Sequence, residues 1–308
     1  MTNTQLTSEQ RFQNARLSLD GLCVGDCFGQ RFFAPGTHAL VQLRQAPPAP
    51  WVYTDDTAMA ISIVRTLLEA KQIDQDKLAA HFADEYNTSP HRGYGAGAHG
   101  LLAALAGGED WRIEAPAMFE GTGSMGNGGA MRAAPIGGYF ADDLDKVAEQ
   151  AALSAEVTHA HPEGQAGAVA VAIAAALAYR ASAEGVQPKP KDFITQVVDY
   201  TPESLTRTNL KQAAVLPGNL KLNDVVRTLG NGSRIIAWDT APFCVWVSAH
   251  RLDHYVEALW TCVRAGGDID TTAAIVGGIV SLFTGQEGIP EEWKRASEPL
   301  PIGRHGML

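Results

Sequence analysis

Two short acidic segments lie far apart in the chain and carry the same kinds of side-chain oxygen. Near the C-terminus, Gly266-Gly267-Asp268-Ile269-Asp270-Thr271-Thr272 places two carboxylates one residue apart, after two glycines and before hydroxyls. Far upstream, Thr54-Asp55-Asp56-Thr57 offers the same groups in another order. Carboxylate and hydroxyl oxygens with no His or Cys at matching spacing favour Mg²⁺ or Mn²⁺ over Zn²⁺. The two segments together therefore predict a site for hard cations.

The number of carboxylates bears on how many ions are expected. Asp55, Asp56, Asp268 and Asp270 exceed what one Mg²⁺ ion usually takes from a protein, so we expect two ions held jointly by both segments. A pair of ions about 3.5–4 Å apart can activate water and hold a diphosphate or sugar hydroxyls. In the alternative interpretation, Asp55 and Asp268 only cap helices, which leaves the second acid of each pair unexplained.

Each acidic segment opens an apolar stretch with helical spacing, so the acids are expected at helix N-termini. These stretches are residues 58–68 and 273–283. A third helical pattern extends from Arg11 to Gly29, and within it Gly25-Asp26 introduces a short loop-prone region. A long alanine-rich helix is predicted from Pro162 to about Ala183, closed by Gly185. Three prolines in residues 46–50 indicate an extended connection over residues 45–51.

No stretch alternates polar and apolar residues between hairpin turns, so an all-α bundle is predicted. If the acidic segments share one site, the first and last thirds of the chain must lie side by side. We therefore expect one domain over residues 1–308, with residues 1–10 as a flexible N-terminus.

The segment Gly121–Arg132 is rich in glycine, which allows backbone amides to approach a ligand closely and converge on an anion. It predicts either a binding loop or a tight structural crossing. Two histidines, His159 and His161, follow downstream; they are either a metal-binding pair or polar contacts at a helix end.

Composition excludes several classes of protein. The 308 residues include 24 basic and 34 acidic side chains, for a net charge of −10, which argues against a broad grip on nucleic acid. No apolar leader is present, and the longest apolar run, residues 166–179, is shorter than the roughly 20 residues a bilayer requires. The four cysteines fit buried thiols of a reducing compartment. A cytoplasmic monomer without membrane contact is expected.

A set of short segments along the chain resembles the ADP-ribosylglycohydrolase family, which includes dinitrogenase-reductase-activating glycohydrolases and the ADP-ribosyl-hydrolases of animals. The resemblance extends in family order from about residue 15 to Trp293, and it is the combination of segments that is specific. The matching segments are Gly25-Asp26, Thr54-Asp55-Asp56-Thr57, Gly126-Asn127-Gly128-Gly129-Ala130-Met131-Arg132, Val157-Thr158-His159, Leu229-Gly230-Asn231-Gly232 and Gly267-Asp268-Ile269-Asp270-Thr271.

The resemblance implies a compact, orthogonal multi-helix bundle with two Mg²⁺ ions in a cleft, for which Mn²⁺ can substitute. The implied reaction is hydrolysis at C1″ of an ADP-ribosyl group, which releases ADP-ribose from a protein side chain or a small conjugate. By residue-by-residue transfer the metal ligands are Thr54, Asp55, Asp56, Asp268, Asp270 and Thr271. Catalytic roles fall to Asp55, Asp56 and Asp270, and substrate contacts to Ser124, Met125, Gly126, Asn127, Gly128 and His159.

One departure from the family pattern opens alternatives. Several members carry a glutamate seven or eight residues after the Gly-Asp pair, whereas residues 27–34 here contain no acid and have Phe33 near that place. Asp56 or another carboxylate then serves as the base, or a metal gate is missing. The alternatives are a relative that binds ADP-ribose or has a structural role without turnover, and a hydrolase of another N- or O-glycosidic conjugate.

Overall fold

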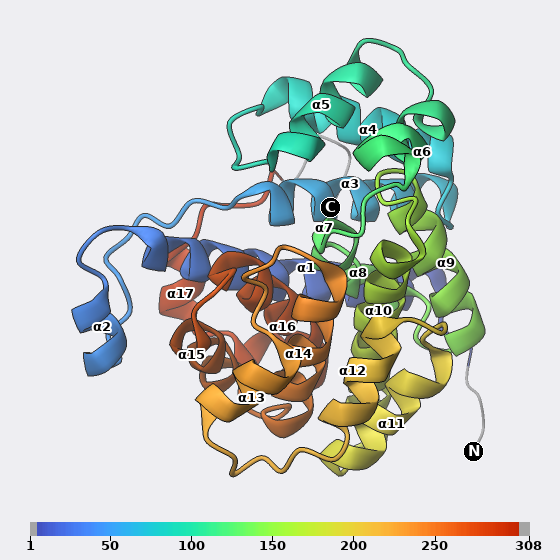
Figure 1. The fold of residues 1–308 in the computed structure, drawn as a ribbon. Helices are drawn as coiled ribbons and strands as arrows, with labels where there is room; N and C mark the ends of the chain where they lie inside the picture. Colours follow the sequence, from blue (N-terminus) through green and yellow to red (C-terminus); the bar gives the residue numbers. More distant parts are fainter. Residues whose placement is uncertain (1–4, 302–308) are drawn as a thin grey trace.

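The computed structural model describes residues 5–301. In it, two long helices from opposite ends of the chain pack against each other: α1 (Ser8–Gln30) and α16 (Ile269–Thr284) (Figure 1). Their contact brings the first and last thirds of the chain side by side. Within residues 5–301 the structure has no strand, only the isolated bridges Trp51–Ser297 and Gly126–Ile236. The all-α fold class predicted from the sequence is confirmed.

The remaining helices surround this pair. In the first half of the chain they are η1 (Arg31–Phe33), α2 (His38–Leu43), α3 (Asp55–Ala70), α4 (Gln75–Thr88), α5 (Ala96–Ala106), α6 (Trp111–Gly121), α7 (Gly128–Met131), α8 (Ala134–Tyr139) and α9 (Leu144–Glu156). In the second half they are α10 (Pro162–Glu184), α11 (Pro190–Tyr200), α12 (Leu205–Ala213), α13 (Leu222–Leu229), α14 (Ala237–His250), α15 (Tyr255–Ala265), η2 (Gln286–Gly288) and α17 (Glu291–Ala296). In Figure 1, α4, α5 and α6 gather above α3 at one end of the molecule.

Local capping explains where several helices begin and end. The Thr7 hydroxyl accepts a hydrogen bond from the Gln10 amide and the Gln10 side chain accepts one from the Thr7 amide, a reciprocal cap for α1. Pro162 occupies the first turn of α10, where its missing N–H costs no hydrogen bond, and Gly185 ends this helix with a φ of 64°. The predicted bounds of the alanine-rich helix are therefore confirmed.

Glycines let α1 and α16 approach more closely than ordinary side chains would allow. A Cβ built at Gly25 would lie 2.8 Å from the carbonyl carbon of Ala273, and one at Gly29 would lie 2.7 Å from the Cα of Asp270. Gly21 meets Ser281 in the same way, so the three glycines form one stripe along α1. The prediction of a loop-prone region at Gly25-Asp26 is wrong, because both residues lie inside α1 and Gly25 serves helix packing.

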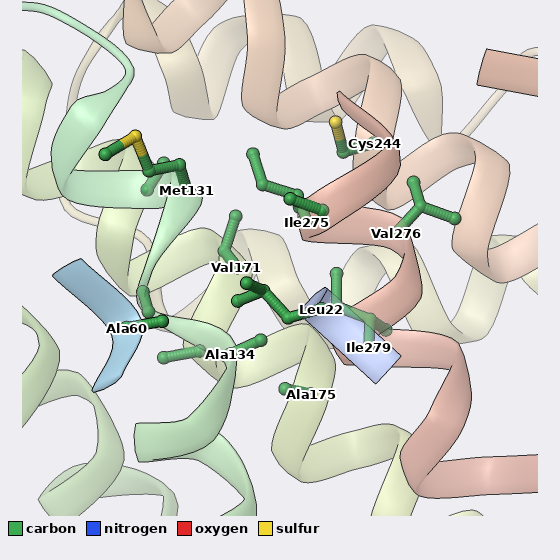
Figure 2. Packing of buried hydrophobic residues seen from close by; sticks show 14 of the residues in the cluster. Leu22, Ala60, Met131, Ala134, Val171, Ala175, Cys244, Ile275, Val276 and Ile279 are labelled. Atoms are coloured by element: carbon green, nitrogen blue, oxygen red, sulfur yellow. The ribbon is translucent and has the colours of Figure 1, made fainter. Parts of the chain in front are cut away.

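The core lies where α1, α3, α7, α8, α10, α14 and α16 converge (Figure 2). Three of these helices contribute fully buried side chains to it: Leu22, Val171 and Ile275. Helix α10 is long and apolar enough by composition to cross a membrane, but 78% of its most apolar window is buried inside the protein. It therefore has the surroundings of a core helix.

Residues 45–50 form the extended connection that the prolines indicated. Residues 1–4 of the expected flexible N-terminus lie outside the described part of the chain, and α1 begins at Ser8. Helices α2, α6, α7, α8 and α17 were not predicted, because they are short or follow weak apolar patterns.

Candidate functional site

The two acidic segments meet at the N-terminal ends of α3 and α16. Asp55 and Asp56 lie in the first turn of α3, Asp270 lies in the first turn of α16, and Asp268 is the residue that precedes this helix. Burial, followed by the charges of Asp26 and Asp270, raises the pKa of Asp56 well above its usual range, and the charges of Asp55 and Asp268 add to this effect. The structure therefore brings together the acids that the sequence places far apart.

Asp26 of α1 lies at the centre of this acidic group and was not among the predicted site residues. Its buried carboxylate accepts hydrogen bonds from the backbone amides of Thr54 and Thr57, at 2.9 and 3.1 Å, and from both of their hydroxyls. Asp26 thus fixes the start of α3 from a neighbouring helix. The sequence held a signal for Asp26, because Gly25-Asp26 is one of the segments that match the family, but no site role was assigned to it.

Asp56 is 2% exposed and only half satisfied. Its Oδ2 accepts a hydrogen bond from the Thr54 hydroxyl at 2.9 Å, while its Oδ1 is buried without a hydrogen-bond partner. A buried carboxylate oxygen without a partner is costly, because it has lost its water and gained nothing in exchange. This oxygen is available to a ligand.

Two loops hold Asp268 in place. The Asn127 side-chain amide donates to Asp268 Oδ2 at 2.7 Å and to the Thr240 hydroxyl at 3.1 Å. The Asp268 amide donates to the Asn231 carbonyl at 3.2 Å, and Gly267 leaves the space that Asn231 needs. Asn127 orients an acid in this structure, and its contact with substrate stays a prediction. Asn231 lies in a segment that matches the family but was given no site role, and Thr240 was missed, because the roles of both depend on tertiary contacts.

The electrostatics of the group are those of crowded negative charge. Burial, followed by the charge of Asp26, raises the pKa of Asp55 to about 7. Burial, followed by the charge of Asp268, raises the pKa of Asp270 to about 8. Burial also raises the pKa of Asp26 to about 6, against the hydrogen bonds from Thr57 and Thr54 that lower it. These carboxylates repel one another when ionised, and a bound cation relieves that repulsion.

The residues present fit a hard divalent cation by their chemistry. The donors are carboxylate and hydroxyl oxygens, and Asp56 Oδ1 has no other partner. Within residues 5–301, no three His, Cys, Asp or Glu side chains are already arranged to hold a metal ion. Mg²⁺ commonly takes only one or two carboxylates and completes its shell with water and substrate oxygens, so it does not require three acids. Thr271, 5% exposed, adds a hydroxyl beside Asp270.

The glycine-rich segment forms the loop that precedes and enters α7. The Met125 carbonyl accepts from the Ala237 amide at 3.0 Å, and Gly126 bridges Ile236, so the loop is tied to the start of α14. The Ser124 hydroxyl accepts from the Gly126 amide at 3.1 Å. Several of these glycines leave space that neighbouring groups fill. They therefore serve the tight structural crossing, which is one of the two predicted roles of this segment.

The two histidines of the 159–161 segment have separate positions. His161 caps α10, where its Nδ1 accepts from the Glu163 amide at 3.0 Å, so it serves as the predicted helix-end contact. The His159 ring fills the space left by Gly126 and Gly128; a Cβ on Gly128 would lie 3.0 Å from His159 Nε2. Burial, followed by the charge of Arg132, lowers the pKa of His159 to about 3, so the ring is neutral.

Two exposed aromatic residues, Phe119 and Phe33, lie close in the chain to predicted site segments. Phe119 is 60% exposed, and its φ of 52° places it in the left-handed region, at a kink in α6 just before the glycine-rich loop. Such a backbone is strained for a non-glycine residue and is common at functional sites. Phe33, 51% exposed at the end of η1, stands where the family glutamate was expected.

A family model for ADP-ribosylglycohydrolase matches residues 7–304, which is nearly the whole chain. The chain belongs to the ADP-ribosylglycohydrolase family. The family is one of glycoside hydrolases, so membership supports an enzymatic role for this chain. The resemblance inferred from the short segments is confirmed.

Known relatives extend over most of the protein. It is 31% identical to "ADP-ribosylhydrolase ARH3" of Mus musculus, with 91% of this chain and 86% of the relative covered. It is 24% identical to "ADP-ribosylarginine hydrolase Tri1" of Serratia proteamaculans, with 94% and 76% covered. The solved "ADP-ribosylglycohydrolase-related protein complex" matches with a TM-score of 0.66 at 23% identity, covering 94% of each chain, and this likeness shows the shared fold.

Proposed function

We propose that this ADP-ribosylglycohydrolase hydrolyses the bond at C1″ of an ADP-ribosyl group in a reaction that requires Mg²⁺. The observation that carries the proposal is the convergence of acids from three helices around Asp56, whose Oδ1 has no partner. In the reaction, water adds to C1″, the bond from C1″ to the acceptor atom breaks, and the acceptor atom takes up a proton. The transition state carries positive charge on the ribose ring, which nearby carboxylates stabilise.

The proposed metal ligands are the six residues predicted from the sequence: Thr54, Asp55, Asp56, Asp268, Asp270 and Thr271. When bound, two Mg²⁺ ions would neutralise this acidic group, lower the pKa of a bound water and hold ribose hydroxyls. Mn²⁺ has the same preference for oxygen ligands and can replace Mg²⁺.

The chain's own residues have distinct roles in this proposal. Asp56 or another carboxylate of this group accepts the proton of the attacking water, and Asp56 Oδ1, which has no hydrogen-bond partner, is the oxygen available to a metal ion. Asn127 keeps Asp268 oriented toward the other acids. The amides of residues 124–128 face the diphosphate, and the exposed Phe119 ring is a platform on which the adenine stacks.

Turnover of defined substrates tests the proposal. Peptides ADP-ribosylated on arginine or serine and small ADP-ribose conjugates are incubated with the protein, with Mg²⁺ in one series and chelator in the other. We expect release of ADP-ribose from at least one substrate with Mg²⁺ and its loss with chelator. Equal release in both series would reject the metal requirement, and no release from any substrate would reject the hydrolase.

A second candidate is a protein that binds ADP-ribose without turnover. It is favoured by residues 27–34, which bring no acid to the site and end near the exposed Phe33. Calorimetry separates the two candidates, since tight ADP-ribose binding together with no product from any conjugate supports binding alone. A metal-dependent product supports the hydrolase.

A further inference from the structure

A fully buried arginine lies behind the glycine-rich loop and has no role in the function proposed above. Arg132 has 0% of its surface exposed. Its Nη1 donates to the Gly128 carbonyl at 3.0 Å, and its Nη2 donates to the Ser154 carbonyl at 3.0 Å and to the Thr158 hydroxyl at 2.7 Å. No carboxylate is among these partners, and its carbon Cζ lies 4.5 Å from the centre of the Phe82 ring. Burying a charged side chain without a hydrogen-bonded carboxylate costs free energy, so a specific role for Arg132 is expected.

The Thr158 hydroxyl connects this arginine to His159. Thr158 is 4% exposed, and its Oγ1 lies 2.7 Å from His159 Nδ1. Because a guanidinium can only donate, the hydroxyl oxygen accepts from Arg132. Within the described chain the one acceptor that the structure gives the hydroxyl hydrogen is His159 Nδ1. A hydrogen on Nδ1 would leave the buried hydroxyl hydrogen without an acceptor, so this arrangement favours Nδ1 as the nitrogen without a hydrogen.

The other nitrogen of a neutral imidazole must then carry the hydrogen. His159 Nε2 faces the loop, since Cβ atoms built on Gly126 and Gly128 would lie 3.2 and 3.0 Å from it. The charge of Arg132 also helps to keep the ring from gaining a second proton, because it lowers the pKa of His159. The side of the ring that faces the loop is thus a hydrogen-bond donor.

We propose that Arg132 is a positioning residue: through the Thr158 hydroxyl it fixes His159 with its hydrogen on Nε2, as a neutral donor to a phosphate or ribose oxygen of a ligand held by residues 124–128. The binding of a ligand by residues 124–128 rests on the function proposed above, but the tautomer of the His159 ring does not. In this state Nε2 is neither a base nor a metal ligand, so His159 differs in role from the acids across the site.

The tautomer is read directly from the metal-free protein. Long-range proton–nitrogen spectra of protein labelled with ¹⁵N-histidine distinguish the two ring nitrogens, and the His159→Asn variant identifies the signal. We expect a neutral ring with its hydrogen on Nε2 between about pH 5 and pH 8. A hydrogen on Nδ1, or a doubly protonated ring at neutral pH, would overturn the proposal.

Two substitutions of Thr158 test the connection. Thr158→Val keeps the shape of the side chain and removes the hydroxyl, and we expect the fixed tautomer to be lost. Thr158→Ser keeps the hydroxyl, so the Nε2 hydrogen should be retained. Arg132→Met should likewise release the tautomer. If Thr158→Val shows the wild-type tautomer, the hydroxyl does not set it and the proposal fails.

Ligand binding provides the functional readout, measured by calorimetry with ADP-ribose. Loss of an aligned donor should weaken binding about 10-fold in Thr158→Val. Thr66→Val is the matched control, because the buried Thr66 hydroxyl lies 2.8 Å from His81 Nδ1 toward the other end of α3. Unchanged affinity in Thr158→Val would count against the proposal. If the wild type binds no ADP-ribose, the proposed function fails while the spectra still decide the tautomer.

Discussion

Gly25 of α1 lies against Ala273 of α16 so closely that a methyl group at Gly25 would come 2.8 Å from the Ala273 carbonyl carbon. The next residue in the chain is Asp26, which holds the start of α3. Ala273 lies one turn beyond Asp270 in α16. This close approach between two helices therefore sets the spacing of the acids from three parts of the chain.

Substitution Gly25→Ala should destabilise the protein. The added methyl group meets backbone, which cannot rotate away, so we expect a loss of about 2–3 kcal/mol in the free energy of unfolding. Urea denaturation measures this loss. The control is Gly100→Ala in α5, where a Cβ meets nothing within 4 Å. There the higher helix propensity of alanine should increase the free energy of unfolding by as much as about 1 kcal/mol. Equal stability of the two variants would show that the helices are not in tight contact at Gly25.

Substitution Asp56→Asn should separate stability from metal binding. In chelator the variant should be at least as stable as the wild type, because one of several mutually repelling carboxylates is gone. Added Mg²⁺ should raise the melting temperature of the wild type and leave the variant unchanged. Thermal melts with and without Mg²⁺ measure both effects, with the exposed Asp253→Asn as control. An equal shift in Asp56→Asn would remove Asp56 from the ligand set.

Substitution Phe119→Ala should weaken ADP-ribose binding. Stacking of a base on an aromatic ring contributes about 1–3 kcal/mol, which corresponds to roughly 5- to 150-fold in affinity. Calorimetry measures this loss, and Ile113→Ala is the control, since Ile113 is 67% exposed on the same helix. Matching affinities for the two variants would place the adenine elsewhere.

The pH dependence of stability should reflect the half-buried ring of His159. Its pKa is lowered from 6.5 to about 3, so the unfolded chain takes up a proton before the folded protein does. Stability is therefore lost as the pH falls below the unfolded pKa, and at pH 5 this loss is about 1–2 kcal/mol.

Comparison of variants isolates this contribution. His159→Gln should lose less stability than the wild type between pH 7 and pH 5, as measured by urea denaturation at each pH. His254→Gln, a substitution of an exposed histidine, should follow the wild type. The same slope in His159→Gln and in the wild type would show that His159 is not held neutral.

The sequence by itself determined the features that depend on neighbouring residues. Helical spacing after Asp56 and after Asp270 placed both acids at helix N-termini, and Pro162 and Gly185 marked the bounds of the alanine-rich helix. These features follow from hydrogen bonds and backbone angles within a few residues, which local sequence specifies.

Tertiary structure alone decided how these pieces work together. Local propensity suggested a break at Gly25, but packing against Ala273 keeps it inside a helix. The central position of Asp26 and the tie between Arg132 and His159 depend on segments separated in the chain. Hydrogen bonds and close packing between separate helices arise only when the chain is folded, because the spacing of residues along it does not specify which helices meet.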